Sequence, residues 1–147
     1  DGPLCLAGGV GTGAGVAAAV AAGADLAYVG SPFIATVEAN ASDAYKRAVV
    51  DAHAEDIVYS NLPTGVHGNY LKSSFLNAGL DPDNLPESDP SKMNFGGADV
   101  KAWRDIWGCG QGIGTLDDVV STADLVERYH QDFSNARDRL FSSLSSE

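Results

Sequence analysis

The segment from residue 7 to 31, AGGVGTGAGVAAAVAAGADLAYVGS, places a glycine-rich loop and a run of alanines between two short apolar stretches. Residues 3–7 and 25–30 are predicted strands that are apolar on both faces, as in a parallel sheet covered on both sides. Thr12 is a predicted helix N-cap, and Gly23 supplies the left-handed residue that ends this helix. The strand–helix–strand order predicts an α/β fold with parallel strands.

The residues after the second strand predict further helices. Ser31 and Pro32 form an N-cap followed by proline at the first helical position, and apolar residues at helical spacing carry this helix to about His53. The segment 55–70 is predicted to be extended, with a Pro-Thr-Gly turn. The remaining predicted elements are a short helix over 70–78 ended by Gly79, an acidic proline-rich surface loop over 79–97, a helix around 98–107 and a long amphipathic helix over 121–144.

Charge restricts the partners of the chain. Nine Lys and Arg residues stand against twenty Asp and Glu residues, which gives a net charge of −11 over 147 residues. Nucleic acid and anionic membranes both need a basic surface, so neither is expected as a partner. No apolar run approaches the ~20 residues of a membrane span. A local pocket for one phosphate group remains compatible with this charge.

The two cysteines carry no metal-binding or disulfide pattern. Cys5 lies in an apolar strand and Cys109 in a glycine-rich turn, with no CxxC or Cys/His spacing. Reduced thiols in a cytoplasmic protein are therefore expected, with no metal site. No basic residue neighbours Cys109 to lower its pKa, so we expect this thiol to be inert.

Glycine between a strand and a helix brings backbone N–H groups close to a phosphate, and two kinds of phosphate site fit this pattern. Gly9, Gly11 and Ala14 match the G-x-G-x-x-G/A pattern of dinucleotide-binding folds. That fold also needs an acidic residue at the end of the second strand to bind the ribose. Asp25 precedes the second strand and so lies at the wrong end of the sheet. The dinucleotide site is therefore disfavoured.

The phosphate site of a (β/α)₈ barrel is formed by the loops after two successive strands and the start of a short helix. Both predicted strands end in glycine, at Gly8-Gly9 and at Gly30-Ser31. The N–H groups of Gly9, Gly30 and Ser31, the Ser31 hydroxyl and the dipole of the helix starting at Pro32 would converge on one anion. The alternative is that these glycines only form tight turns. Two such loops in tandem favour the phosphate site.

Four stretches of the chain, AGGVGTGAGVAAAVAAGADLAYVGSPFIATVEA, YKRAVVDA, TGVHGNYLKSS and WRDIWGCGQGIG, resemble the C-terminal part of the nitronate monooxygenase family, also called 2-nitropropane dioxygenases. The resemblance implies a flavin-binding (β/α)₈ barrel. The chain would then supply its last two βα units (1–55), an extended segment with an acidic loop (56–97) and C-terminal helices that cover the barrel (98–147). The residues that the resemblance assigns to the phosphate of FMN are Gly8, Gly9, Tyr28, Val29, Gly30 and Ser31.

The resemblance also implies an activity. It is the FMN-dependent oxidation of alkyl nitronates by O₂ to a carbonyl compound and nitrite. The family's catalytic histidine belongs to an earlier part of the barrel, so it is expected upstream of Asp1, and no catalytic residue is assigned here. The three histidines of this chain, His53, His67 and His130, do not match its context. The chain is thus expected to be inactive alone and to need an N-terminal barrel segment or a partner chain.

One residue and two alternatives stay open. Gln111, in the turn Trp107–Gly112, either lies near the flavin or only belongs to a glycine-rich link between helices. The same phosphate loops would also serve an NAD(P)H:quinone reductase or a flavin-dependent enoyl-thioester reductase. A third possibility is a non-enzymatic assembly module, whose exposed strand edges a partner chain would cover.

Overall fold

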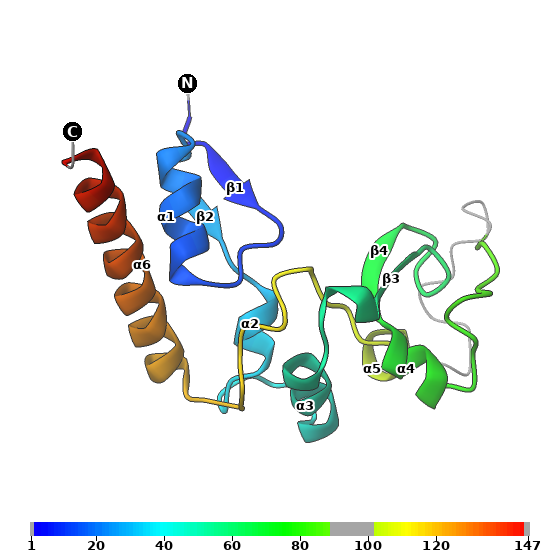
Figure 1. Ribbon diagram of the computed structural model, residues 1–147. Coiled ribbons are helices and arrows are strands. Elements are labelled where there is room, and N and C mark those ends of the chain that lie inside the picture. The colour runs from blue at the N-terminus through cyan, green and yellow to red at the C-terminus, as the bar shows by residue number, and fades with distance from the viewer. Residues whose placement is uncertain (1, 89–101, 146–147) are drawn as a thin grey trace.

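The computed structural model describes residues 2–88 and 102–145 (Figure 1). A parallel strand–helix–strand unit and the long C-terminal helix lie at one end, and an antiparallel hairpin with two short helices lies at the other. The elements, in chain order, are β1 (Cys5–Ala7), α1 (Gly13–Ala21), β2 (Leu26–Tyr28), α2 (Ser31–Ile34), α3 (Asp43–Asp51), a 3-10 turn (Ala54–Asp56), β3 (Ile57–Ser60), β4 (Gly68–Leu71), α4 (Lys72–Asn77), α5 (Ala102–Asp105) and α6 (Thr122–Leu144).

The predicted parallel unit is confirmed. β1 pairs with β2 in parallel, with Leu6 opposite Ala27. The Thr12 hydroxyl accepts the N–H of Gly15 at 3.1 Å and so caps α1, as its sequence position predicts. Gly23 follows α1 with φ of +99°, the left-handed conformation that ends a helix.

The prediction that both strands are buried is wrong for this chain. Leu6 is 37% exposed, Leu26 56% and Tyr28 68%. The apolar pattern of a parallel strand anticipates neighbouring strands on both sides and helices on both faces. Within the described residues, β1 and β2 pair only with each other, so most of this apolar surface stays uncovered.

The prediction of one helix from Ser31 to about His53 is also wrong. The helix stops after one turn, because the segment around Val120 pairs with the chain at Thr36. The N–H of Val37 donates to the carbonyl of Val120 at 2.9 Å instead of continuing a helix. A new helix, α3, then starts at Ser42, whose hydroxyl accepts the N–H of Tyr45 at 3.3 Å.

The downstream predictions are confirmed in outline. The extended segment is an antiparallel hairpin in which Ile57 of β3 faces Leu71 of β4. Gly79 follows α4 with φ of +76°, and α6 spans nearly the predicted range, with Ser121 as its N-cap. The acidic loop has no regular structure as far as residue 88, while residues 89–97 and the start of the helix predicted at 98–107 lie outside the described residues.

One core cluster joins most of the elements. Leu71 of β4 and Leu125 of α6 are almost fully buried at its centre. The other buried members are Ala35, Val49, Val50, Ala52, Cys109, Ile113 and Leu116. A smaller cluster of Tyr70, Phe75 and Ile106 lies under the hairpin. Of the helices in the described ranges, none is long and apolar enough to cross a membrane.

Helices α1 and α6 pack side by side (Figure 1). Gly13, the first residue of α1, lies against the backbone of α6. A methyl group on Gly13 would lie 2.8 Å from Cβ of Asp132 and would also clash with the carbonyl oxygen of Tyr129. Only glycine permits this approach, since real Cβ contacts are not that short. The approach of α6 at Tyr129, Asp132 and Phe133 thus depends on the absence of a side chain at the start of α1.

We expect Gly13→Ala to lower the free energy of unfolding by about 1–3 kcal/mol, because the two helices must move apart. Urea unfolding measures this change. The matched control is Gly15→Ala on the same helix, where an added methyl makes only ordinary contacts, with Val10 Cγ1 at 3.5 Å and Thr12 Oγ1 at 3.6 Å. Alanine is the better helix former, so the control should be neutral or slightly stabilising. Equal effects of the two substitutions would contradict this account of Gly13.

Candidate functional site

The loop after β1 leaves two glycines open to solvent. Gly8 and Gly9 have φ of +95° and +70°, and nothing lies within 4 Å of a side chain built on either. Both are exposed. Positive φ at two successive residues is a conformation that glycine adopts readily and other residues rarely do. The loop therefore presents bare backbone at the carboxyl end of β1.

The other glycines of this run have packing roles. A side chain on Gly11 would lie 2.9 Å from Thr115 Cγ2 and would clash with the carbonyl oxygen of Gly112. At Gly13, the backbone of α6 occupies the space that a side chain would need. The G-x-G-x-x-A pattern therefore combines an open glycine, Gly9, with a glycine held by close packing, Gly11. This division explains the pattern without a dinucleotide.

Asp25 provides a second argument against a dinucleotide site. Its carboxylate accepts the N–H of Leu4 at 2.8 Å, at the amino end of the strand pair. The ribose-binding acid of a dinucleotide fold belongs beyond the carboxyl ends of the strands. Asp25 is therefore a structural residue that fixes the start of β1.

The second loop begins at the end of β2, where Gly30 is the N-cap residue of α2. Among the described residues, the N–H groups of Gly9 and Gly30 have no hydrogen-bond acceptor. An added Cβ on Gly30 meets only Tyr28 Cε1, at 3.9 Å. Two free N–H groups therefore lie in open loops that follow adjacent parallel strands.

Ser31 is the first residue of α2 and not its predicted N-cap, which is Gly30. Its hydroxyl oxygen accepts the N–H of Gly110 at 2.7 Å, so the side chain is engaged by a distant loop. The predicted helix dipole is weaker than expected, because α2 has 4 residues and few peptide dipoles add up. The backbone of this loop, more than the helix, would have to bind an anion.

The distant loop, residues 107–112, is held by contacts with several elements and is called the 107–112 loop below. The N–H of Leu71 donates to the carbonyl of Trp107 at 2.9 Å, and the N–H of Cys109 donates to the carbonyl of Asn69 at 3.0 Å. The Tyr45 hydroxyl donates to the carbonyl of Gly108. Its ring also stacks on Trp107 with centroids 5.2 Å apart. Strand β4 and helix α3 thus fix one end of the loop.

Gln111 lies between the two contacts that the other end of this loop makes. Gly110 binds Ser31, and a side chain on Gly112 would lie 2.9 Å from the carbonyl oxygen of Val10. Gln111 itself is exposed. The turn therefore contacts residues of both glycine loops, and the position of Gln111 near the flavin stays a prediction.

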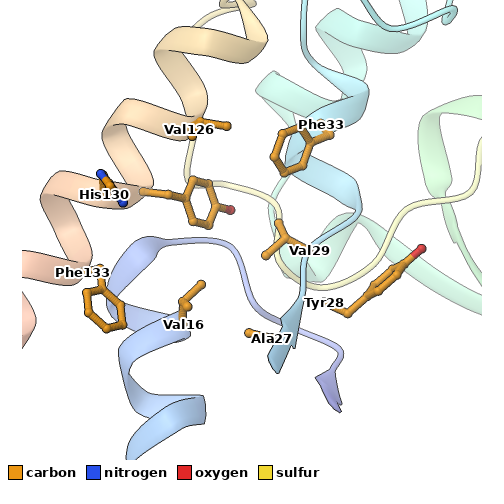
Figure 2. Close-up of a pocket in the computed structure, with 9 residues that line it drawn as sticks. Val16, Ala27, Tyr28, Val29, Phe33, Val126, His130 and Phe133 are labelled. Carbon is orange, nitrogen blue, oxygen red and sulfur yellow. The ribbon is translucent and has the colours of Figure 1, made fainter. Parts of the chain in front are cut away.

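Tyr28 and Val29 face different surroundings. Val29 points into an apolar pocket of about 460 Å³ between β2, α1, α2 and α6, whereas the Tyr28 ring points away from it (Figure 2). The other lining residues are Val16, Ala27, Phe33, Val126, Tyr129, His130 and Phe133. The buried Tyr129 hydroxyl has no hydrogen-bond partner among the described residues. Burial, followed by the charge of Asp132, raises the pKa of Tyr129 to about 12. The pocket is thus lined mainly by apolar side chains.

The three histidines occupy separate places. The N–H of His53 donates to the Asp56 carboxylate at 2.8 Å at the start of the 3-10 turn. His67 stacks on Tyr59 of the hairpin, with ring centroids 4.9 Å apart. His130 is an exposed residue of α6. Over the residues that the structure covers, no three His, Cys, Asp or Glu side chains are grouped to hold a metal ion.

The two cysteines are free thiols with opposite environments. Cys5 is exposed and Cys109 is buried. Burial raises the pKa of Cys109 to about 11, although a hydrogen bond with Ser31 opposes this shift. Cys109 is therefore a neutral thiol at physiological pH, as expected from its sequence context.

A parallel strand–helix–strand unit with two open glycine loops at its carboxyl edge is the arrangement found in one part of a (β/α)₈ barrel. The model of the nitronate monooxygenase family matches residues 1–132, and the chain belongs to this family. A nitronate monooxygenase of Paraburkholderia phytofirmans is 35% identical over 80 residues, which are 54% of this chain and 22% of that protein.

Solved structures agree with this fold. A nitroalkane oxidase from Streptomyces ansochromogenes matches with a TM-score of 0.71 and 28% identity, over 95% of this chain and 42% of that one. FabK from Thermotoga maritima matches with a TM-score of 0.68 and 21% identity, over 97% of this chain and 48% of that one. The chain thus spans less than half the length of these solved relatives.

The environments of the two cysteines predict different reactivity. With iodoacetamide at pH 7.5, we expect Cys5 to be alkylated in the folded chain and Cys109 to react only after unfolding, because alkylation needs an accessible thiolate. Mass spectrometry of peptides from native and urea-treated protein measures both sites. Equal labelling of the two cysteines under native conditions would contradict the burial of Cys109.

Proposed function

We propose that this chain supplies the phosphate-binding part of an FMN-dependent oxidoreductase that oxidises alkyl nitronates with O₂ to a carbonyl compound and nitrite. The observation that carries the proposal is the pair of free N–H groups, on Gly9 and Gly30, in two open loops after adjacent parallel strands. Membership of the nitronate monooxygenase family supports the substrate class. The free cysteines support a cytoplasmic location.

The donor set suits the terminal phosphate of FMN. A phosphate accepts hydrogen bonds from backbone N–H groups, and glycine allows the backbone to approach it closely. Gly8 and Gly9 leave open space where side chains would stand, and Gly30 has only the edge of the Tyr28 ring nearby. The residues that would hold the phosphate are Gly8, Gly9, Tyr28, Val29, Gly30 and the backbone of Ser31, with Gln111 beside them.

In this proposal FMN supplies the electron transfer, and the chain holds and orients it. The N–H groups of the two loops fix the phosphate end of the cofactor. Two N–H groups from separate loops determine its position better than one loop would, because the phosphate must satisfy both. The exposed Gln111 offers an amide that can donate and accept hydrogen bonds near the same edge.

The remainder of the barrel would come from an N-terminal segment or a partner chain, and would also carry the catalytic base. The exposed apolar residues of β1 and β2, Leu6, Leu26 and Tyr28 among them, support this part of the proposal. They have the character of strands that other strands flank and helices cover. The activity of the isolated chain is therefore expected to be absent.

A second candidate is an NAD(P)H:quinone reductase or a flavin-dependent enoyl-thioester reductase, because such enzymes would use the same phosphate loops. The likeness to FabK of Thermotoga maritima supports the shared fold. A steady-state assay of the intact protein decides between them. Turnover of propyl nitronate with O₂ supports the first candidate. Turnover of NADH with a quinone or an enoyl thioester, without nitronate oxidation, supports the second. A chain with no flavin in any assembly would instead indicate a non-enzymatic module.

The phosphate site predicts a preference among cofactors. The intact protein should bind FMN at least about tenfold more tightly than riboflavin. Riboflavin has no phosphate, so it would leave the backbone N–H groups of the two glycine loops unpaired. NAD⁺ should not displace FMN, since Asp25 is bound to Leu4 and no acid follows β2. Titration of the apoprotein, followed by flavin fluorescence, measures all three ligands. Equal affinities for FMN and riboflavin would exclude the phosphate site.

The same titration tests the second loop. Gly30→Val should abolish most FMN binding, because the added side chain would occupy the open space through which the phosphate would approach. Gly2→Val is the matched control, since Gly2 also has open space around it but lies before β1. Full FMN occupancy in Gly30→Val would refute the assignment of this loop.

No histidine of this chain is expected to be the catalytic base. Replacing His53, His67 and His130 by Gln, one at a time, should leave nitronate turnover by the intact protein within about tenfold. Removal of a general base costs roughly 10²–10⁴-fold. A loss of that size at any one position would overturn the assignment of the base to the rest of the barrel.

A further inference from the structure

We propose that Ser31 is a positioning residue and that the 107–112 loop locks the two glycine loops at a fixed separation. This inference rests on the proposed phosphate site and refines it, because Ser31 then acts through Gly110 instead of binding the phosphate with its hydroxyl. The lock consists of two attachments, one from Gly110 to Ser31 and one from Gly112 to Val10 and Gly11.

The first attachment is a hydrogen bond. The Ser31 oxygen accepts the N–H of Gly110 at 2.7 Å. A hydroxyl has one donor and two acceptor sites. One of its acceptor sites is therefore used by the 107–112 loop. The side chain faces that loop, while the N–H of Gly30 stays free.

The second attachment is a backbone contact. A Cβ on Gly112 would lie 2.9 Å from the carbonyl oxygen of Val10 and 3.2 Å from the nitrogen of Gly11. A Cβ on Gly11 would in turn clash with the carbonyl oxygen of Gly112. Two glycines that face each other in this way allow the two backbones to cross in direct contact. This contact sets the loop after β1 against the same segment that binds Ser31.

Hydrogen bonds to other elements anchor the first residues of the 107–112 loop. Leu71, Asn69 and the Tyr45 hydroxyl bind its first residues through the backbone. The N–H of Trp107 donates to the Ser74 hydroxyl at 3.1 Å. An anchored segment that contacts both glycine loops fixes the distance between them. A phosphate bound by N–H groups from both loops needs that distance held within a fraction of an ångström.

The experiment compares Ser31→Ala, which removes the hydroxyl, with Gly112→Ala, which changes no group proposed to contact the phosphate. Ser31→Ala and Gly112→Ala should each weaken FMN binding by about tenfold, although Gly112→Ala removes no donor. In the double variant the losses should not multiply, because both changes break one lock. Ser31→Thr should restore binding. Gly15→Ala, which places a methyl in ordinary contact, is the control and should leave the affinity unchanged.

A second measurement needs no flavin. The Gly110 amide should be protected from hydrogen exchange in the wild type, exchange faster in Ser31→Ala and regain protection in Ser31→Thr. This readout also serves if Gly112→Ala fails to fold. An unprotected Gly110 amide in the wild type would overturn the lock.

The outcomes separate this inference from the proposed function. Loss of FMN affinity in Ser31→Ala with full affinity in Gly112→Ala would mean that Ser31 is a direct ligand, as would multiplied losses in the double variant. Wild-type protein that binds no FMN would overturn the proposed function and the ligand-related part of this inference. The Gly110 exchange would still decide whether the lock exists.

Discussion

The backbone of residues 107–112 is the constraint on which the arrangement of this chain depends. It is hydrogen-bonded to β4 through Leu71 and Asn69, stacked on α3 through Tyr45, and bound to Ser31. It therefore joins the hairpin end of the chain to the parallel βα unit. Alternating glycines make this possible, because at Gly112 a side chain would separate the two backbones.

The sequence predicted local structure well wherever a residue acts on its own neighbours. Thr12 and Ser121 begin helices and Gly23 and Gly79 end them, because capping involves residues only a few positions apart. The break between α2 and α3 could not be predicted in this way. It depends on Val120, which pairs with the chain at Thr36 from more than eighty residues away. The same holds for strand burial, because within the described ranges β1 and β2 pair only with each other.

Only the part of the candidate site that depends on local sequence features could be predicted. The glycine pattern and the missing ribose acid pointed to the two loops, and both are local features of the sequence. The sequence did not show which glycines are open to solvent and which are packed against other residues. Gly9 is open and Gly11 is packed, yet both stand in one short run, and only their contacts with Thr115 and Gly112 separate them. The engagement of Ser31 by Gly110 likewise joins residues 79 positions apart.

These contacts have a consequence for how the proposed phosphate site would be formed. Its two loops follow strands that are largely exposed in this chain, so the sheet alone gives them little support. Their conformations depend instead on the 107–112 loop and on α6, which packs against Gly13. Both supports come from this chain. A site held by C-terminal elements can be ordered before the rest of the barrel assembles, which lowers the entropy lost when the phosphate binds.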